Sequence, residues 1–319
     1  MAYDRVWVLA DDRPGNVTQA LGVAEALGEP FRIQDIRYDR WGGWHNALRG
    51  ISLRGVTAAS RASLAPPWPA LVIGAGRRTA PVARWIKRQS ACRLVQLMDP
   101  GWPGRDDFDL IVAPQHDGLP DRPNVLHSLG ACHRASCALL AAEGQRWAGR
   151  LAHLKRPYLV VVVGGATKDR AFGPEHGEQL AAGVAALHEK MGGSILVTTS
   201  RRTPAELTDR LIRNLPQPCY AFRWRDGAEN PYLGFLALAD SIVVTGDSMN
   251  MCSEACANGG PVYIFAPPGF VSDKHARLHR ALITNGYARP FGAEGVPWAH
   301  PPLNAAADVA REIKARGLL

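Results

Sequence analysis

Side chains that could take part in catalysis follow the first strand-like segment of this 319-residue sequence. The apolar run 6–10 is typical of a buried strand, and Asp11 and Asp12 come directly after it. A carboxylate in such a turn can act as a base that deprotonates a hydroxyl group. The alternative for either aspartate is to cap the helix that begins after Pro14 and Gly15. We take Asp11 as the candidate base, and His116 and Asp117, which follow a later strand, as the substitutes.

A second loop combines glycine with arginine between an expected strand and an expected helix. Gly74 and Gly76 precede Arg77 and Arg78, and Asp99 ends the next strand. The spacing approaches a dinucleotide-binding fingerprint, in which an acid about 20 residues further on binds a ribose. However, the loop follows the third strand rather than the first, so we favour a site in which the arginines hold a phosphate or an acidic acceptor group. The residues expected to face such an acceptor are Asn16, Gln19, Gly76, Arg77, Arg78, Asp99 and Gln115.

Three further loops in the second half of the chain suit a phosphorylated nucleotide. Small residues at 164–165 allow backbone N–H groups to approach a phosphate, and the basic residues nearby supply positive charge. The spacing is not that of a P-loop. Capped helix starts with solvated arginines are the alternative. The residues expected to contact the nucleotide are Gly164, Gly165, Lys168, Arg170, Ser200, Arg201, Asp247, Ser248, Asn250, Ser253 and Glu254.

Glu254 is the most specific of these candidates. It lies about two turns into the helix that begins at Ser248 and has no basic neighbour at helical spacing. A glutamate is costly to bury unless it binds donors such as the hydroxyl groups of a ribose. The alternative is an exposed helical glutamate.

Strands that alternate with helices must position these loops. Strands are expected at 31–36, 71–73, 93–98 and 110–113 after the first, and at 158–163, 195–199, 220–224, 241–245 and 261–265 in the second half. A long helix or a helix pair is expected at 127–154, followed by a break at 155–157. Such alternation predicts parallel sheets whose loops gather at the carboxyl edge. We therefore expect an α/β protein of two Rossmann-like domains, 1–154 and 155–319.

Composition narrows the class of protein. Hydrophobic residues make up 46% of the chain and charged residues 21%, as in folded soluble proteins. The net charge of +8 comes mostly from arginine, but basic tails and RNA-binding motifs are missing, so we expect no nucleic-acid partner. The six cysteines form no CxxC pair, which favours reduced thiols and no metal site. The chain starts almost directly with a strand and has no long apolar run, so we expect a cytoplasmic protein without a signal peptide.

The segment 247–261, with Asp247-Ser248, Ser253-Glu254-Ala255 and a later Gly-Pro pair, resembles the donor-nucleotide motif of GT-B glycosyltransferases. Over nearly its whole length the chain is similar to the mitochondrial fission ELM family. The motifs that carry this resemblance are 11–20, 74–78, 114–117, 164–165, 198–204, 230–232 and 247–255.

The resemblance implies a GT-B-like fold: two Rossmann-like domains facing across a cleft, with the C-terminal helix packing back on the first. The family's activity is poorly defined, although its bacterial members are described as glycosyltransferases, and our hypothesis is a metal-independent inverting glycosyltransferase without a cofactor. A nucleotide-diphosphate sugar would be bound by the second domain and an acceptor, such as a cell-envelope glycolipid, by the first. Glu254 would hold the ribose, the Ser248 turn would meet the diphosphate, and Lys168, Arg170 and Arg201 would offset the charge of the leaving group.

Two other functions stay open. Plant members of the family are implicated in recruiting a dynamin-related protein to mitochondria, so a non-catalytic protein that binds nucleotide sugars or recruits a partner is the first alternative. An NAD(P)-dependent epimerase or oxidoreductase fits less well, because the sequence has no Tyr-x-x-x-Lys pair and the first strand lacks GxGxxG. The sequence leaves the oligomeric state open.

The segment 39–54 interleaves tryptophan, leucine and arginine, with Trp41 and Trp44 at its centre. Such a composition can lie on an anionic membrane surface, where indole rings sit at the level of the headgroups. The alternative is a partly buried insertion that packs against its own domain. A peripheral contact with the inner membrane is therefore one expectation for this segment.

Overall fold

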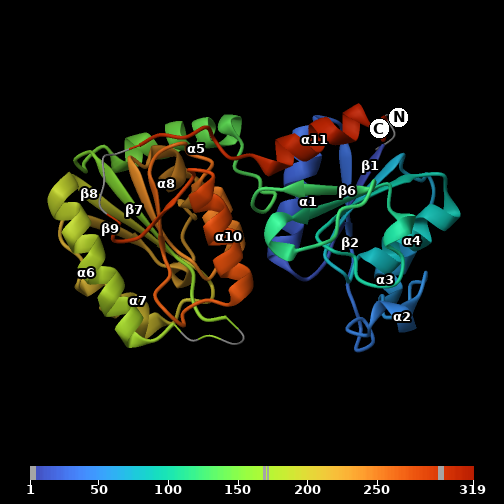
Figure 1. The fold of residues 1–319 in the computed structure, drawn as a ribbon, viewed down its shortest axis with the longest axis horizontal. Coiled ribbons are helices and arrows are strands. Elements are labelled where there is room, and N and C mark those ends of the chain that lie inside the picture. Colours follow the sequence, from blue (N-terminus) through green and yellow to red (C-terminus); the bar gives the residue numbers. More distant parts are fainter. Residues whose placement is uncertain (1–4, 168–169, 171, 294–297) are drawn as a thin grey trace. The chain divides into compact units, whose positions relative to one another are not determined.

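The computed structural model describes residues 5–167, 170, 172–293 and 298–319. The chain forms two compact units (Figure 1). Unit 1 comprises Met1–Arg134 and Asn304–Leu319, and unit 2 comprises Ala135–Leu303. The division therefore lies before the helix that the sequence assigned to the end of the first domain, and the C-terminal segment returns to unit 1.

Unit 1 is a parallel six-stranded sheet covered by helices on both faces. The strand order is β2-β1-β3-β4-β5-β6. The strands are β1 (Val6–Ala10), β2 (Phe31–Asp35), β3 (Leu71–Ala75), β4 (Arg93–Leu97), β5 (Leu110–Pro114) and β6 (Val125–Ser128). The helices are α1 (Pro14–Leu27), α2 (Asn46–Arg49), α3 (Ala58–Ser63), α4 (Ala80–Gln89) and α11 (Ala305–Ala315), with single turns η1 (Arg105–Asp107) and η2 (Gln115–Asp117).

The two faces of this sheet bury different halves of the same strands. Val6 and Val8 of β1 pack with α1 and α11, whereas Trp7 and Leu9 pack with α4. A strand that is buried on both faces must be apolar along its whole length, as β1 and β3 are. Sequence reasoning could recognise these strands because no polar residue interrupts them.

Unit 2 repeats this architecture with the strand order β12-β11-β10-β7-β8-β9, again all parallel. The strands are β7 (Tyr158–Val163), β8 (Ser194–Thr199), β9 (Cys219–Phe222), β10 (Ser241–Thr245), β11 (Val262–Phe265) and β12 (Arg289–Pro290). The helices are α5 (Cys137–Leu151), α6 (Pro174–Met191), α7 (Ala205–Arg213), α8 (Tyr232–Leu238), α9 (Met249–Ala255) and α10 (Asp273–Thr284), with a single turn η3 (Trp224–Asp226).

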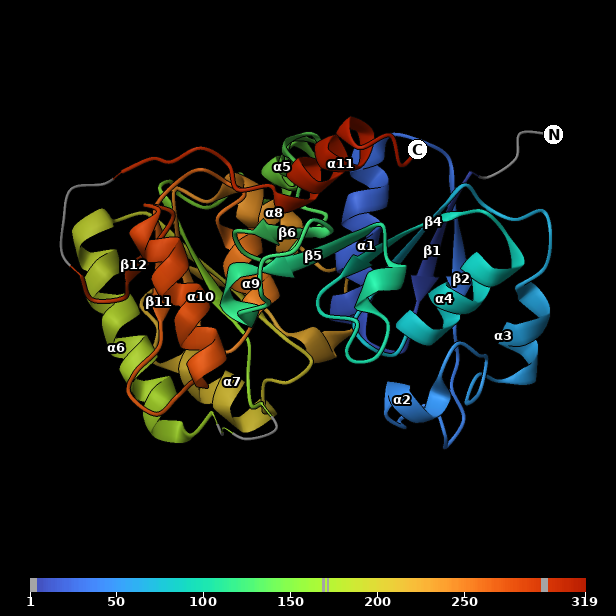
Figure 2. The ribbon, with the colours of Figure 1, turned by 45° about the vertical axis from the view of Figure 1, so that its right-hand side comes forward.

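The C-terminal helix packs on the first unit, as the sequence led us to expect. In Figures 1 and 2, α11 lies beside α1, and Val309 and Ile313 of α11 belong to the same apolar cluster as Val23 and Leu27 of α1. Helix α5 instead packs against α8 of unit 2, where Trp147 and Phe235 meet with ring centroids 6.2 Å apart. These contacts explain why the unit boundaries differ from 154/155.

The expected helix or helix pair at 127–154 is only partly present. Its first residues form β6, and the helical part is α5 alone. The strand was missed because β6 is half-buried, so its side chains lack the continuous apolar run of the inner strands. No helix in the part of the chain that the structure describes is long and apolar enough to cross a membrane.

Candidate functional site

In each sheet the chain adds strands first on one side of a starting strand and then on its other side. The loops at this switch point commonly bind ligands in open α/β sheets. In unit 2 this point lies between β7 and β10, which are neighbours in the sheet. The loops that follow them begin with Gly164 and Gly246. β8 is the other neighbour of β7, and its loop begins with Ser200. The three candidate loops therefore follow three adjacent central strands.

Asp247 ties these loops together. Its side chain is buried, with 3% of the residue exposed. The carboxylate oxygen Oδ2 accepts a hydrogen bond from the backbone N–H of Gly165 at 2.8 Å and one from Nη2 of Arg202, also at 2.8 Å. One carboxylate thus joins the loops after β7, β8 and β10. The other oxygen, Oδ1, is buried and has no hydrogen-bond partner among the described residues.

Gly164 and Gly165 are required by this close approach. A Cβ atom on Gly164 would lie 2.2 Å from Oδ2 of Asp247, and one on Gly165 would lie 2.4 Å from the carbonyl oxygen of Arg202. The N–H of Gly164 donates to Oγ1 of Thr245 at 2.7 Å. Both glycine N–H groups are therefore engaged within the protein. This differs from the expectation that they face a phosphate.

Hydroxyl groups complete the junction between the loops after β7 and β8. Oγ of Ser200 donates to the carbonyl oxygen of Gly164 at 2.6 Å, and Thr203 donates to the same carbonyl. Ser200 Oγ also accepts from the N–H of Arg202 at 3.1 Å. Ser200 is thus a structural link in the loop pair. The bond from the N–H of Arg202 to Ser200 also fixes the backbone position of Arg202.

Glu254 is buried in the second turn of α9, with 8% of the residue exposed. The hydroxyl group of Tyr232, at the start of α8, donates to its Oε2 at 2.6 Å. Burial raises the pKa of Glu254, while the hydrogen bond from Tyr232 acts in the opposite direction. Burial and the neighbouring carboxylate also raise the pKa of Tyr232 well above its usual value. The alternative of an exposed helical glutamate is therefore wrong.

The remaining candidates of unit 2 differ in accessibility. Arg170 and Arg201 are exposed, whereas Lys168 lies outside the described residues. Ser248 caps α9, and its Oγ accepts from the N–H of Met251 at 3.4 Å. Ser253 is fully buried and donates to the carbonyl oxygen of Met249, while Asn250 is half-buried. The two arginines are thus the cations with the freest access to solvent.

Three residues near this network were not predicted as site residues: Arg202, Tyr232 and His275. His275 of α10 interacts electrostatically with Asp247 and Arg202, and burial lowers its pKa. Its Nδ1 lies 2.8 Å from Oγ of Ser272. Arg202 stood beside the predicted Arg201, and only the bend of the loop decides which of the two points inward. His275 follows no motif, so the sequence carried no signal for it.

In unit 1 the switch point lies between β1 and β3, and the loops after these strands carry the predicted acceptor residues. Asp11 is buried, with 8% exposed. Its Oδ1 accepts from the N–H of Arg13 at 3.0 Å, and its Oδ2 accepts from Nδ2 of Asn16 at 3.2 Å. Burial is the largest influence and raises the pKa of Asp11. A carboxyl group with a raised pKa is a better proton acceptor than an ordinary aspartate.

Asp12 and the loop after β3 meet at the same edge of the sheet. Nη1 of Arg78 pairs with Oδ1 of Asp12 at 2.6 Å, while Arg77 is exposed. Gly76 adopts a positive φ of 72°, and a Cβ there would lie 2.8 Å from Nδ2 of Asn16. Asn16 thus bridges Asp11 and the arginine loop. This arrangement brings two predicted segments, 11–16 and 76–78, together.

Asp99 is not available for the ribose contact of a dinucleotide fingerprint. Both of its carboxylate oxygens accept from Arg105, at 2.9 and 2.7 Å, and this pairing lowers the pKa of Asp99. Of the substitute bases, His116 is buried, with Nε2 3.5 Å from Oδ1 of Asp117. Gln19 is buried in α1, and Gln115 is exposed. The alternative of an NAD(P) site therefore lacks the acidic residue that would bind the ribose.

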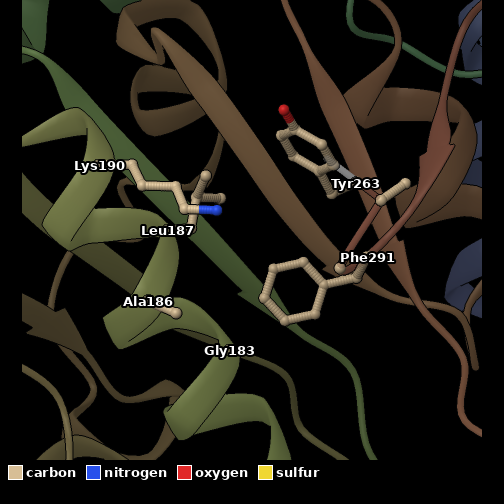
Figure 3. A pocket seen from close by; sticks show the side chains of 8 residues that line it. Gly183, Ala186, Leu187, Lys190, Tyr263 and Phe291 are labelled. Carbon is tan, nitrogen blue, oxygen red and sulfur yellow. The ribbon is translucent and has the colours of Figure 1, made fainter. Parts of the chain in front are cut away.

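A cavity of about 450 Å³ lies elsewhere in unit 2 (Figure 3). Its wall is formed by α6, β11 and the residues after β12, with Tyr263 and Phe291 as the aromatic side chains and Lys190 on the opposite wall. None of the predicted site residues lines it. Within the described part of the chain, no group of three or more histidine, cysteine or acidic side chains is placed to hold a metal ion.

Comparison with known sequences extends over most of the chain. A family model described as mitochondrial fission ELM1 matches residues 14–317. Mitochondrial fission protein ELM1 of Arabidopsis thaliana is 29% identical, over 83% of this chain and 69% of that protein. An uncharacterized protein of Rickettsia prowazekii is 28% identical, over 97% of both chains.

Comparison with solved structures identifies the fold. The UDP-GlcNAc 2-epimerase of Methanocaldococcus jannaschii has a TM-score of 0.54 at 12% identity and matches 97% of this chain and 99% of its own. MurG of Acinetobacter baumannii has a TM-score of 0.51 at 11% identity (98% and 92%). The glycosyltransferase SnogD of Streptomyces nogalater has a TM-score of 0.52 at 14% identity (99% and 95%). The two-domain α/β fold is therefore the one that glycosyltransferases and UDP-sugar epimerases of this type share.

Proposed function

This chain belongs to the mitochondrial fission ELM1 family, and from that premise we propose that it binds a nucleotide-diphosphate sugar through unit 2 and transfers the sugar without a metal ion. The observation that carries the proposal is the loop network around Asp247, which fixes three loops at the switch point of the sheet. Solved structures of this fold include a UDP-GlcNAc 2-epimerase of Neisseria meningitidis bound to UDP-GlcNAc and a co-structure of S. aureus MnaA with UDP. Their ligands suggest the substrate class, while the residues of this chain must supply the contacts.

Positive charge at the loop edge would stabilise the departing nucleoside diphosphate. Arg170 and Arg201 are exposed, and Arg202 keeps about a third of its side chain exposed while Asp247 holds one of its nitrogens. Guanidinium groups bind phosphate oxygens in fixed geometry and remain charged at any physiological pH. When the bond between the anomeric carbon and the diphosphate breaks, the electron pair leaves with the phosphate oxygen, and the arginines would offset that charge.

Glu254 would bind the ribose hydroxyl groups through the oxygen that Tyr232 does not occupy. Tyr232 fixes Oε2, so Oε1 can accept from a diol without any rearrangement of the side chain. A buried carboxylate gains most from such donors, because water no longer competes for it. Tyr232 is therefore a positioning residue in this proposal, and Glu254 is the ligand-binding one.

Asp11 of unit 1 is our candidate for the base. It would take the proton from the acceptor hydroxyl group as that oxygen attacks the anomeric carbon from the side opposite the diphosphate, which inverts the configuration. Its neutral neighbour Asn16 and its raised pKa support this role. We propose that the acceptor is a cell-envelope glycolipid. We also propose that the transfer takes place in the cytoplasm.

The first experiment is a thermal-shift screen of the full chain with UDP-, GDP-, ADP- and CMP-sugars. A ligand at a hundred times its Kd stabilises the folded state by about 2.7 kcal/mol, so a clear rise in the unfolding midpoint is expected for one nucleotide class. Arg201→Ala and Glu254→Gln should each reduce that rise, and Arg311→Ala, an exposed arginine of α11, should keep it. A rise with NADP in place of every nucleotide sugar would contradict the proposal.

Catalysis needs a second experiment, because a non-catalytic protein that binds nucleotide sugars or recruits a partner would pass the first. The nucleotide sugar that binds is incubated with the protein and an envelope lipid extract, and products are separated by mass. A new glycolipid and free nucleoside diphosphate support transfer. Unchanged substrate in the presence of tight binding supports the recruitment alternative, and a sugar changed at one stereocentre while still attached to the nucleotide supports epimerisation.

A further inference from the structure

Large apolar side chains gather on one exposed part of unit 1. Among the described residues, six large hydrophobic side chains are exposed, and four of them lie in 41–48 and at 102. Trp41 is 40% exposed, Trp44 42%, Leu48 61% and Trp102 68%. We refer to these four residues as the tryptophan patch. Asn46 and Arg49 of the segment 39–54 are buried, so the segment packs against its own domain as a partly buried insertion, while its aromatic side chains remain exposed.

The two segments of the tryptophan patch are joined by a buried asparagine. Nδ2 of Asn46 donates to the carbonyl oxygens of Arg77 and Pro100, at 2.8 and 2.7 Å. Pro100 is two residues from Trp102, and Asn46 is two residues from both Trp44 and Leu48. Trp41 and Trp44 touch each other, with ring centroids 4.5 Å apart. Asn46 thus holds together the two segments that carry the four side chains.

Buried polar contacts hold this surface in place. Arg49 is 1% exposed and donates to the carbonyl oxygens of Arg54 and Arg78. A bridge between Tyr38 and Val56 closes the base of the segment. Helix α2 lies below α4 in both views of the ribbon (Figures 1 and 2). The tryptophans therefore project from a fixed platform, so contact with a partner would cost little ordering entropy.

The rim of the tryptophan patch is positively charged. Arg40 stacks on the ring of Trp41, with its guanidinium carbon 4.5 Å from the centroid. Arg54 and Arg77 are also exposed, and none of these three arginines forms an ion pair within the residues that the structure covers. The nearest acid in sequence, Asp39, accepts from the N–H of Trp41. The rim thus offers unpaired cations around exposed indole rings.

We propose that the tryptophan patch is a peripheral attachment surface for an anionic lipid bilayer. Indole rings favour the headgroup region, where their apolar body and N–H group are both accommodated, and arginines on the rim attract anionic headgroups. An acidic protein partner would match the charges alone, but four exposed apolar side chains from two adjoining loops suit a deformable apolar layer better. The patch lies at the carboxyl edge of the sheet of unit 1, as Asp11 does, because Arg77 follows β3 and Asp11 follows β1.

The experiment is flotation of the full chain with vesicles of phosphatidylcholine alone and of phosphatidylcholine mixed with phosphatidylglycerol. We expect binding to the mixed vesicles, and a partition coefficient about tenfold lower for the Trp41→Ala/Trp44→Ala variant. Arg40→Ser and Arg54→Ser should each lower it about fivefold, and less so at high salt. Trp224→Ala, which removes a tryptophan that is 46% exposed in unit 2, is the matched control and should bind as the parent does.

Three results would overturn the proposal: no binding to either vesicle, equal binding to both, or an equal loss in Trp224→Ala. Thermal unfolding midpoints identify any variant that fails to fold, and the arginine variants then provide the test, because their side chains are exposed. The proposal does not depend on the nucleotide site. A thermal shift with nucleotide sugars that survives in Trp41→Ala/Trp44→Ala would separate failure at the membrane from failure of the proposed transferase.

Discussion

Asp11 and Asp247 hold equivalent places in the two units, yet their surroundings differ in charge. Each follows the last residues of a strand at the switch point, is more than nine-tenths buried and accepts from a loop N–H. The second donor to Asp11 is the neutral amide of Asn16, whereas the second donor to Asp247 is the guanidinium of Arg202.

In the function that we propose, this difference would separate a carboxylate that accepts a proton from one that holds loops together. Burial is the largest influence on the pKa of Asp11 and outweighs the hydrogen bonds from Arg13 and Asn16, so its affinity for a proton rises. The ion pair between Asp247 and Arg202 instead joins loops and stabilises their arrangement at the edge of the sheet. We therefore propose that the same position in the two units serves proton transfer in unit 1 and loop structure in unit 2. The predictions below test that distinction.

The largest effect is expected for Asp11→Asn, which keeps the side-chain size but removes the proton acceptor. Loss of a general base lowers the rate by about 10²–10⁴-fold, and we expect transfer to fall within that range. Nucleotide binding to unit 2 should persist. The measurement compares turnover with the thermal shift for the same protein sample.

Asp12→Asn is the matched control for that comparison. Its carboxylate is 64% exposed and, among the residues that the structure describes, pairs with Arg78 alone, so activity should change little. Equal activity losses in the two variants would show that the substitutions had disturbed the structure of the loop at the sheet edge and had not acted through loss of the base. Unchanged transfer in Asp11→Asn would remove Asp11 from the mechanism.

Gly164→Ala tests the architecture of the other unit. The new methyl group would meet the Asp247 carboxylate at 2.2 Å, so the loop or the aspartate must move. Such overpacking costs about 3 kcal/mol of unfolding free energy. Urea unfolding measures the loss, and nucleotide binding should weaken with it. Gly149→Ala, at a helical site in α5 with no atom within 4 Å of the new methyl group, should instead stabilise the protein slightly.

Asp247→Asn is expected to have a smaller effect than Gly164→Ala. The amide cannot accept from Arg202 as a charged partner, and a hydrogen bond to a charged group contributes about 2 kcal/mol. Because about a third of the Arg202 side chain is exposed, solvent offsets part of the loss. Asp12→Asn should cost less than about 1 kcal/mol in the same urea measurement. Equal losses for the two variants would contradict the structural role assigned to Asp247.

The strands and most helices could be predicted because their signal is local. The inner strands β1, β3 and β7 are unbroken apolar runs, and β10 is apolar between Ser241 and Thr245, as expected for strands of a sheet buried on both faces. β12 has two residues, and its position depends on pairing with β11, so no sequence window could reveal it. The unit boundary was misplaced for a similar reason, since the partners of α5 and α11 are far away in the sequence.

The candidate site could be predicted at the level of loops but not of bonds. Residue types showed that 164–165, 198–204 and 247–254 carry polar groups after strands. They could not show that Asp247 takes the N–H of Gly165, or that Arg202 rather than Arg201 turns inward. Those choices depend on distances of a few tenths of an ångström between segments that are tens of residues apart.

The smallest effect, and the one with the most informative sign, is expected for Glu254→Gln. Burial raises the pKa of Glu254 above its ordinary value of 4.5, so the folded protein retains a proton that the unfolded chain releases. The resulting stability is fully present below pH 4.5 and is lost as the pH rises through the raised pKa. The variant lacks this titration. Relative to the parent, it should therefore gain stability between pH 5 and pH 8 in urea unfolding.

The same substitution should weaken nucleotide binding by about tenfold, because a neutral amide is a poorer acceptor for ribose hydroxyl groups than a carboxylate. A variant that is more stable at pH 8 yet binds nucleotide less tightly would identify Glu254 as a residue kept for binding at the expense of stability. Tyr232→Phe, which removes the donor to Oε2, should show the opposite dependence, with a larger loss of stability at pH 8 than at pH 5. If both variants followed the pH profile of the parent, Glu254 would resemble Asp247 as a structural carboxylate, and the contrast between the two kinds of site would apply to Asp11 alone.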